Sequence, residues 1–363
     1  MNRLYYKIIT PDRKGYWQPV YCILGAVSIL YKSVLAIRRW CYRSGLFRTR
    51  RLDCRVISVG NLTLGGTGKT PMVMMIADIL RRHGRKPAIL SRGYKGNASR
   101  QVSVVCDGER ILLSAEAAGD EPVMMARRLK TVPVLTGSNR YLAGLHAIER
   151  LGADTLILDD GFQHLRLHRD LNILLVDHQR PFGTGGVFPA GDLREPACEI
   201  RRADLLCITR HTAGDGNPSL EAGLDGDIPI LKTTVRPRSV VRLDTGELLA
   251  PEQLRNQNVA AFCGIARPED FRRVLDQLQA RVVLYRAFPD HHAYSPQDLK
   301  SIEQDALQAG ARFILTTAKD AVKLKTAAFA VPVLQVVIDL EIVEGEEVFN
   351  RYILNRAGVS LSD

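Results

Sequence analysis

The sequence predicts an α/β protein in which helices cover both faces of a mainly parallel sheet, followed by a second, smaller α/β lobe. Three observations indicate this fold class. The 363 residues suffice for about two domains, short apolar runs alternate with helical stretches, and a β-branched run near residue 60 leads into a glycine-rich turn. With 46% hydrophobic and 25% charged residues, the composition is that of an ordinary globular protein.

The glycine-rich turn has the form of a phosphate-binding loop, so the first domain is expected to be P-loop NTPase-like. Backbone N–H groups of such a loop, with the start of the following helix, bind nucleotide phosphates. Lys69 is expected to reach the β- and γ-phosphates, and Thr70 to bind Mg²⁺. Thr63 stands where the motif usually has its first glycine, so the loop is a variant. The expected nucleotide-binding residues are Gly65, Gly66, Thr67, Gly68, Lys69 and Thr70.

Six apolar strands are expected in the first domain, and several polar motifs follow them directly. Ligands of open α/β sheets bind beyond the carboxyl ends of the strands, which is where these motifs fall. The expected strands are 56–59, 87–90, 132–135, 155–158, 172–176 and 204–209.

Asp159 and Asp160 follow the expected strand 155–158, in the manner of a Walker B segment. A carboxylate at this place can bind Mg²⁺ opposite Thr70, directly or through a water molecule. Adjacent side chains of an extended chain point to different sides, so one aspartate is expected to address the metal and the other a neighbouring loop. Which aspartate contacts the metal stays open. A plain Asp-Asp-Gly turn is the alternative.

Two further polar segments lie beyond expected strands. Arg92 and Tyr94, together with Arg140, are candidates for binding the anionic head of an acceptor. The Gly-Asp-Glu-Pro segment has two interpretations. It could begin a helix with Asp120 as the N-cap and Pro122 in the first turn, which sequence physics alone favours. Asp120 could instead accept the proton of an attacking hydroxyl, as the base of a kinase does.

The smaller lobe is expected from about residue 212, after the loop-like segment 212–218. Strands there end near Gly264, Phe288 and Thr317. Adjacent His291 and His292 cannot both bind one metal from a regular strand, so a histidine that supports a carboxylate base is favoured over a zinc site, with a surface turn as the alternative. The seven cysteines are scattered without a C-x-x-C pair, which indicates neither a disulfide framework nor zinc.

The positive charge of the chain is concentrated at its start. Residues 1–51 hold eleven Lys or Arg residues and one acidic residue, Asp12, which accounts for +10 of the net +11. A nearly neutral body behind a basic leader argues against nucleic acid as the partner and favours an anionic membrane surface. We therefore expect a basic amphipathic leader at 1–51, a P-loop core at 52–211 and the smaller lobe at 212–363.

The segment 20–37 in this leader is apolar or small apart from Lys32, and its length could just span a bilayer. A narrow polar stripe at seven-residue spacing instead favours an N-terminal membrane-associating helix that lies in the interface with its basic edge toward the head groups. A spanning helix and an ordinary core-packing helix remain open, whereas a cleaved secretory signal is not expected. The stripe consists of Gln18, Gly25, Lys32 and Arg39, with Tyr21 and Ser28 between them.

Taken together, these motifs resemble the tetraacyldisaccharide 4′-kinase family of lipid A biosynthesis, over essentially the whole chain. The resemblance implies ATP- and Mg²⁺-dependent phosphorylation of the 4′-hydroxyl of tetraacyldisaccharide 1-phosphate to lipid IVA, at the cytoplasmic face of the inner membrane. It also implies that Asp120 is the base, helped by His291, with His292 as the other candidate. Ala318 stands where relatives often carry glutamate, so position 318 receives no role. The matching segments are 60–71, 91–94, 119–122, 159–164, 264–266, 290–291 and 319–323.

Two other functions compete with this interpretation. The first is a membrane-associated nucleotide switch, but the chain lacks an Asn-Lys-x-Asp segment for guanine and has Leu64 where partition ATPases place an extra lysine. The second is a soluble small-molecule kinase whose leader merely packs on its core. The expected partners are thus an acylated disaccharide phosphate and an anionic membrane surface. No obligate protein partner is evident.

Overall fold

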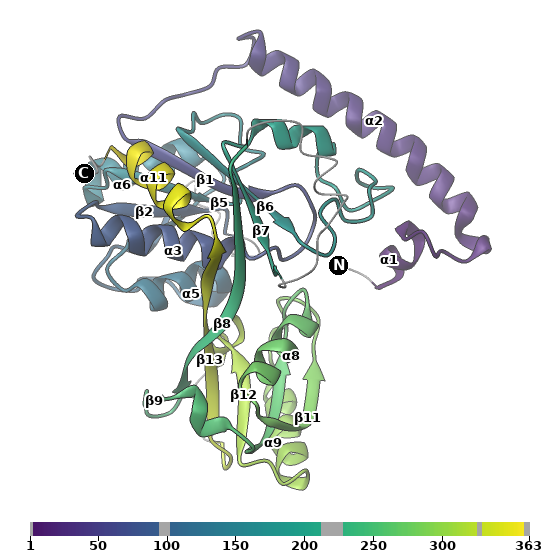
Figure 1. Cartoon of the computed structure of the whole chain (residues 1–363), viewed down its shortest axis with the longest axis vertical. Coiled ribbons are helices and arrows are strands. Elements are labelled where there is room, and N and C mark those ends of the chain that lie inside the picture. Colours follow the sequence, from purple (N-terminus) through teal and green to yellow (C-terminus); the bar gives the residue numbers. More distant parts are fainter. Residues whose placement is uncertain (1–2, 94–101, 212–227, 325–328, 359–363) are drawn as a thin grey trace.

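The computed structural model describes residues 3–93, 102–211, 228–324 and 329–358. Two lobes share one continuous sheet of 13 strands in the order β11-β10-β12-β13-β8-β7-β6-β1-β5-β2-β4-β3, with β9 paired to β8 (Figure 1). The expected P-loop α/β fold with a second lobe is confirmed.

The sheet of the first lobe is parallel except at its edge. All six expected strands form, and adjacent pairs among them run parallel. The strand expected at 132–135 begins two residues later than expected and ends one residue later. β3 (Ser103–Cys106) was not expected, and it pairs antiparallel with β4. The strands are β1 (Arg55–Asn61), β2 (Pro87–Ser91), β4 (Val134–Thr136), β5 (Thr155–Asp159), β6 (Leu171–Asp177) and β7 (Leu205–Thr209).

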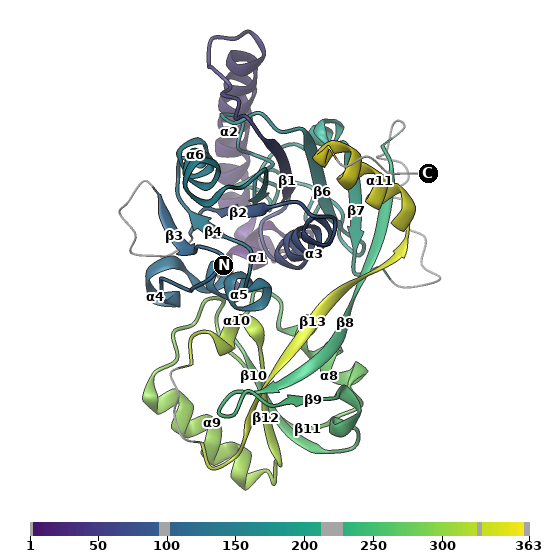
Figure 2. The same ribbon diagram turned by 90° about the vertical axis from the view of Figure 1, so that its left-hand side faces the viewer.

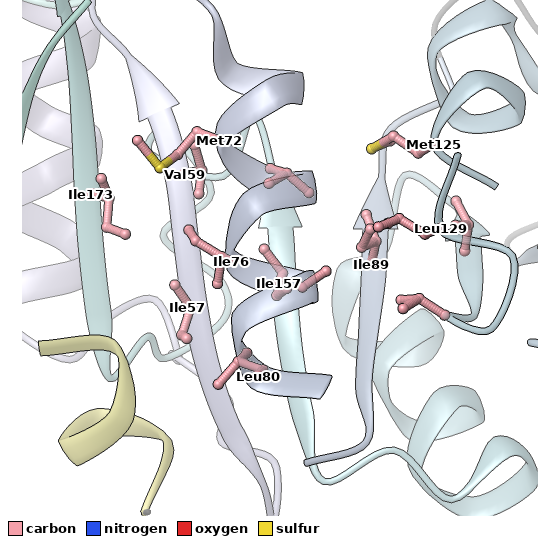
Figure 3. Packing of buried hydrophobic residues seen from close by; sticks show 14 of the residues in the cluster. Ile57, Val59, Met72, Ile76, Leu80, Ile89, Met125, Leu129, Ile157 and Ile173 are labelled. Carbon is pink, nitrogen blue, oxygen red and sulfur yellow. The ribbon is translucent and has the colours of Figure 1, made fainter. Parts of the chain in front are cut away.

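Helices cover both faces of this sheet. On one face, α3 (Lys69–Arg82) packs Met72, Ile76 and Leu80 against Ile57 and Val59 of β1 (Figure 3). The same face receives α4 (Ala115–Ala118), α5 (Asp120–Leu129) and α11 (Glu346–Ala357). The opposite face is covered by α6 (Arg140–Leu151) and the 3-10 helix η2 (Ala197–Arg202). Successive residues of a strand point to opposite faces, so both sides of this parallel sheet must be apolar.

The second lobe is a smaller α/β unit. Its parallel strands are β10 (Asn258–Cys263), β11 (Arg281–Ala287) and β12 (Phe313–Thr317). Around them lie β9 (Leu248–Leu249), the 3-10 helix η3 (Pro251–Leu254), α8 (Pro268–Gln277), α9 (Pro296–Gln308) and α10 (Ala318–Ala321). The expected loop at 212–218 lies outside the described residues.

Two long antiparallel strands, β8 (Ile230–Arg242) and β13 (Val333–Glu344), connect the lobes (Figure 2). After β13 the chain returns to the first lobe, where Phe349 and Ile353 of α11 are buried in the core with α3. The proposed range 212–363 therefore includes one helix that packs on the first lobe.

The leader comprises α1 (Arg3–Ile9), the 3-10 helix η1 (Gly15–Trp17) and α2 (Gln18–Arg43). In the described part of the chain, the segment Gly15–Arg43 is the one helical stretch long and apolar enough to cross a membrane, and α2 runs along the outside of the first lobe (Figure 1). Its outward residues form the α2 apolar face. They are Val20, Ile23, Val27, Ile29, Leu30, Val34, Ile37 and Trp40, all exposed.

Part of the polar side of α2 contacts the protein body. Ser28 Oγ donates to the Val187 carbonyl at 2.7 Å, and Arg39 forms a 3.1 Å ion pair with Glu199. The expectation that the polar stripe turns toward lipid head groups is wrong at these two positions, because their partners lie in the body. Lys32 of the stripe remains exposed.

Candidate active site

A cleft of about 3310 Å³ lies between the lobes, and the phosphate-binding loop, Asp120, Asp159, Asp160 and His291 all line it. The first-lobe residues lie at or just after the carboxyl ends of β1 and β5 or begin α5, as expected for a parallel sheet. The sequence-predicted residues are thus brought together from both lobes.

The loop after β1 adopts the conformation that its glycines predict. Gly65 and Gly68 have φ of 109° and 84°, which side chains disfavour, and Gly68 caps α3 so that Lys69 is the first helical residue. The Thr67 hydroxyl is buried without a hydrogen-bond partner in the described structure. A buried orphan hydroxyl in a loop at a helix N-terminus fits a missing phosphate ligand.

The unusual Thr63 has a structural explanation. It forms a bridge with Leu193, and its carbonyl accepts a hydrogen bond from Asn61 Nδ2 at 2.8 Å. Asn61 also accepts from Lys69 Nζ at 3.0 Å through Oδ1. One side chain, Asn61, therefore closes the turn and holds the loop lysine.

Asp159 and Asp160 have different partners, as expected for adjacent side chains that point to different sides of the chain. Asp159 is buried and accepts from Ser91 Oγ at 3.1 Å. Burial raises its pKa, and the charges of Glu121 and Asp160 act in the same direction.

Asp160 accepts a hydrogen bond from Arg194 Nη1 at 2.7 Å and lies 3.5 Å from Lys69 Nζ. Although burial opposes it, the charges of Lys69 and Arg194 lower the pKa of Asp160 to about 2. Arg194 lies in a loop and carried no sequence signal.

Asp120 from α5 meets His291 from the second lobe. His291 Nδ1 lies 2.9 Å from Oδ1 and 2.8 Å from Oδ2 of this buried carboxylate. Burial raises the pKa of Asp120, but the hydrogen bond from His291 and the charge of Lys319 outweigh it, so the pKa lies below its ordinary value. Asp120 does begin a helix, but as its first residue, because Gly119 is the N-cap.

His292 has a different partner, Asp298, at 3.2 Å from its Nε2. His291 itself has a left-handed φ of 59°, as do Asp160 at 55° and Arg210 at 58°. Non-glycine residues seldom adopt this conformation, and such strain concentrates at functional sites. All three line the cleft.

Arg210, which the sequence reasoning missed, connects three elements beside the phosphate-binding loop. It donates to Asp177 at 2.5 Å, to Asp270 of α8 at 2.7 Å and to the Gly66 carbonyl at 2.7 Å. Asp177 also pairs with Arg267. Arg210 follows the carboxyl end of β7. The rule that ligands bind beyond the carboxyl ends of strands, which identified the aspartates, therefore applies to Arg210 as well.

The three candidate acceptor-binding residues differ in position. Arg92 is exposed and lines the cleft, whereas Arg140 is buried and donates to the Gly137 carbonyl. Burial lowers the pKa of Arg140 to about 10, although the charges of Asp159 and Asp160 oppose this. Tyr94 lies outside the described residues.

A phosphate-binding loop, paired carboxylates and a carboxylate–histidine pair in one cleft define a P-loop phosphotransferase. The model of the family described as tetraacyldisaccharide-1-P 4′-kinase matches residues 20–357. The chain belongs to this family of kinases, which phosphorylate the 4′-position in lipid A biosynthesis.

Individual relatives agree with this family. The tetraacyldisaccharide 4′-kinase of Syntrophus aciditrophicus (strain SB) is 46% identical over 84% of this chain and 85% of its own. The tetraacyldisaccharide 4′-kinase of Geobacter sulfurreducens is 43% identical over 88% of this chain and 90% of its own. The crystal structure described as the "apo" form of LpxK from Aquifex aeolicus in complex with ATP is 35% identical, covers 93% of this chain and 99% of its own, and has a TM-score of 0.77.

Proposed function

We propose that this chain transfers the γ-phosphoryl group of ATP to the 4′-hydroxyl of a tetraacyldisaccharide 1-phosphate, giving lipid IVA, with Asp120 as the base. The observation that carries these roles is the Asp120–His291 pair. It places an ionised carboxylate in the same cleft as the phosphate-binding loop.

The transfer needs few covalent changes. Asp120 accepts the proton of the 4′-hydroxyl while the hydroxyl oxygen forms a bond to the γ-phosphorus, and the bond from that phosphorus to the bridging oxygen breaks, so that ADP leaves. His291 donates to Asp120 and orients it. Lys69 and the loop N–H groups neutralise charge on the transferred group.

The side-chain oxygens of Thr70, Asp159 and Asp160 fit Mg²⁺, which prefers hard oxygen donors. When bound, Mg²⁺ would neutralise charge on the β- and γ-phosphates. Asp160 is already paired with Arg194, whereas Asp159 is buried and accepts a hydrogen bond from Ser91. We assign the metal to Thr70 and these two aspartates, with Asp159 as the direct ligand.

The acceptor's anionic head is assigned to Arg92, Tyr94 and Arg140. Arg92 is exposed in the cleft and can contact an incoming substrate, whereas the buried Arg140 supplies a fixed positive charge near the aspartates.

The leader is proposed to hold the enzyme on the cytoplasmic face of the inner membrane, where ATP is available and the acylated acceptor resides. Ser28, Arg38 and Arg39 of α2 all contact the protein body, so protein covers that side of the helix at these positions. This favours α2 lying in the interface, with the α2 apolar face toward the acyl chains, over a helix that crosses the bilayer. The proposed organisation is leader 1–51, P-loop core 52–211 and smaller lobe 212–363.

The test is an incubation of purified protein with γ-labelled ATP, Mg²⁺ and tetraacyldisaccharide 1-phosphate in detergent micelles. Label at the 4′-position that depends on Lys69, with K69A as the control, supports the proposal. Hydrolysis of ATP without labelled lipid would favour a nucleotide switch and reject it.

A further inference from the structure

Lys319, at the start of α10, lies against the imidazole of His291. Its Nζ is 2.8 Å from Glu121 Oε1, 3.1 Å from Asp290 Oδ1 and 3.3 Å from His291 Nε2. Three acceptors thus surround the three N–H donors of one ammonium group. Burial lowers the pKa of Lys319, but the charges of Glu121 and Asp120 outweigh it and raise the pKa, so Lys319 stays charged.

This contact has a consequence for the protons of His291. An ammonium group donates and cannot accept, so Nε2 of His291 must be the acceptor and carries no hydrogen. The hydrogen of a neutral imidazole then sits on Nδ1, which faces both oxygens of Asp120. In this arrangement His291 donates from Nδ1 to Asp120.

We infer that Lys319 is a positioning residue that holds His291 in its Nδ1–H tautomer and so makes Asp120 the proton acceptor. This inference rests on the proposed roles of Asp120 and His291. With a hydrogen already on Nδ1, His291 cannot take the hydroxyl proton at that atom. The ionised carboxylate of Asp120, held by the same hydrogen, takes it.

Loss of the Lys319 charge changes the balance at Nε2. Asp290 Oδ2 lies 3.8 Å from that atom, and Asp120 faces the other nitrogen. Without the ammonium, no donor-only group faces Nε2, so a hydrogen on Nε2 can be donated toward Asp290. A hydrogen moved from Nδ1 to Nε2 removes the hydrogen bond that lowers the pKa of Asp120, and the enzyme becomes less active.

Lys319 also joins the two lobes beside this pair. Glu121 belongs to α5 of the first lobe, directly after Asp120, whereas Lys319, Asp290 and His291 belong to the second lobe. The contacts of Lys319 with Glu121 and of His291 with Asp120 therefore both join the two lobes beside the proposed base.

The direct test reads the tautomer in the resting enzyme by long-range ¹H–¹⁵N correlation NMR on ¹⁵N-histidine-labelled full-length protein in micelles near pH 8. The H291Q variant assigns the resonance. We expect a protonated Nδ1 and an unprotonated Nε2 in the wild type, and a proton on Nε2 in K319M. K319R, which keeps a donor-only cation, is expected to keep the wild-type pattern.

The matched control is K323M. Lys323 is a similarly buried lysine, and its Nζ lies 2.7 Å from Asp320 and 4.0 Å from Asp120. We expect its removal to leave the His291 tautomer unchanged. Circular dichroism and thermal unfolding check that each variant folds.

Kinetics supply a second measurement. K319M is expected to lower kcat about tenfold or more with a small change in KM for ATP, and to move the acidic limb of the rate to higher pH, whereas K319R restores both in part. A wild-type His291 protonated on Nε2 overturns the inference, and so does K319M with an unchanged tautomer and pH profile. If Asp120 is not the base, D120N keeps full turnover. The NMR measurement of the His291 tautomer is independent of that result.

Discussion

His291 Nδ1 lies 2.8 Å from Asp120 Oδ2, although the residues come from different lobes and are 171 positions apart in the sequence. The base of the proposed reaction is therefore complete only when the lobes are together. Since Asp120 begins a helix of the first lobe and His291 follows a strand of the second, neither lobe contains the pair by itself.

Removal of the His291 imidazole is expected to change the pH dependence of the reaction. The hydrogen bond from His291 lowers the pKa of Asp120, so H291A raises that pKa and moves the acidic limb of kcat/KM to higher pH. The rate itself falls by about 10²-fold or more. Initial rates across pH 5 to about 9 measure both effects.

The matched control is H292A. His292 bonds Asp298 and stacks on Phe288, away from Asp120. We expect its acidic limb to coincide with that of the wild type. An H291A enzyme whose limb does not move contradicts the assignment.

Arg210 is expected to support ATP binding through the phosphate-binding loop. R210M removes donors to Asp177, Asp270 and the Gly66 carbonyl, so the loop and the second lobe lose a shared anchor. The affinity for ATP should fall about tenfold or more, since charge-assisted hydrogen bonds contribute roughly 1.5–3 kcal/mol each. Equilibrium binding of a fluorescent ATP analogue measures this.

R236M serves as the comparison for Arg210. Arg236 pairs with Glu341 at 2.7 Å, but the pair is exposed. The side chain of Arg236 is 61% exposed and that of Glu341 is 50% exposed. Exposed ion pairs contribute little, so its ATP affinity should stay within about twofold of the wild type. Equal losses in both variants argue against a specific contribution from Arg210.

The fold could be predicted from local pattern because apolar strands and the Gly-Lys-Thr turn carry their signal within a few residues. All six expected strands of the first lobe form, and the predicted motifs line one cleft. Partners such as Arg194 on Asp160 could not be predicted, since loop residues meet them only through the tertiary fold. The direction of the α2 polar stripe was predicted wrongly at Ser28 and Arg39, because amphipathicity alone does not say whether a polar side meets lipid or protein.

The α2 apolar face is expected to hold the enzyme on membranes. Ile23 and Leu30 are 65% and 68% exposed on this face. The double change I23E/L30E should lower binding to vesicles with anionic lipid by tenfold or more, because each buried side chain contributes roughly 1.5–3 kcal/mol. Co-sedimentation measures it.

L307E is the control for this prediction. Leu307 is 54% exposed on α9 of the second lobe, far along the chain from the leader. Its vesicle binding should equal that of the wild type. Undiminished binding of I23E/L30E indicates that another surface contacts the membrane.

The metal assignment predicts a dependence on Asp159. Chelation of divalent ions should abolish phosphate transfer, and Mg²⁺ should restore it. D159N, which removes one carboxylate charge from the proposed site, should need about tenfold more Mg²⁺ for half-maximal rate. Titrations of rate against Mg²⁺ measure this, with D276N as the control, since Asp276 is exposed on α8 and pairs with Arg272. If D159N has the Mg²⁺ dependence of the wild type, the assignment of Asp159 is wrong and Asp160 is the direct ligand.

The central claim, that Asp120 takes the proton of the 4′-hydroxyl, is tested most directly by D120N under single-turnover conditions with saturating ATP and lipid acceptor. The asparagine keeps the shape of the side chain and removes the basic oxygen. We predict a rate of lipid phosphorylation reduced by about 10²-fold or more, with ATP affinity within a few-fold of the wild type. Phosphorylation at the wild-type rate would contradict the account.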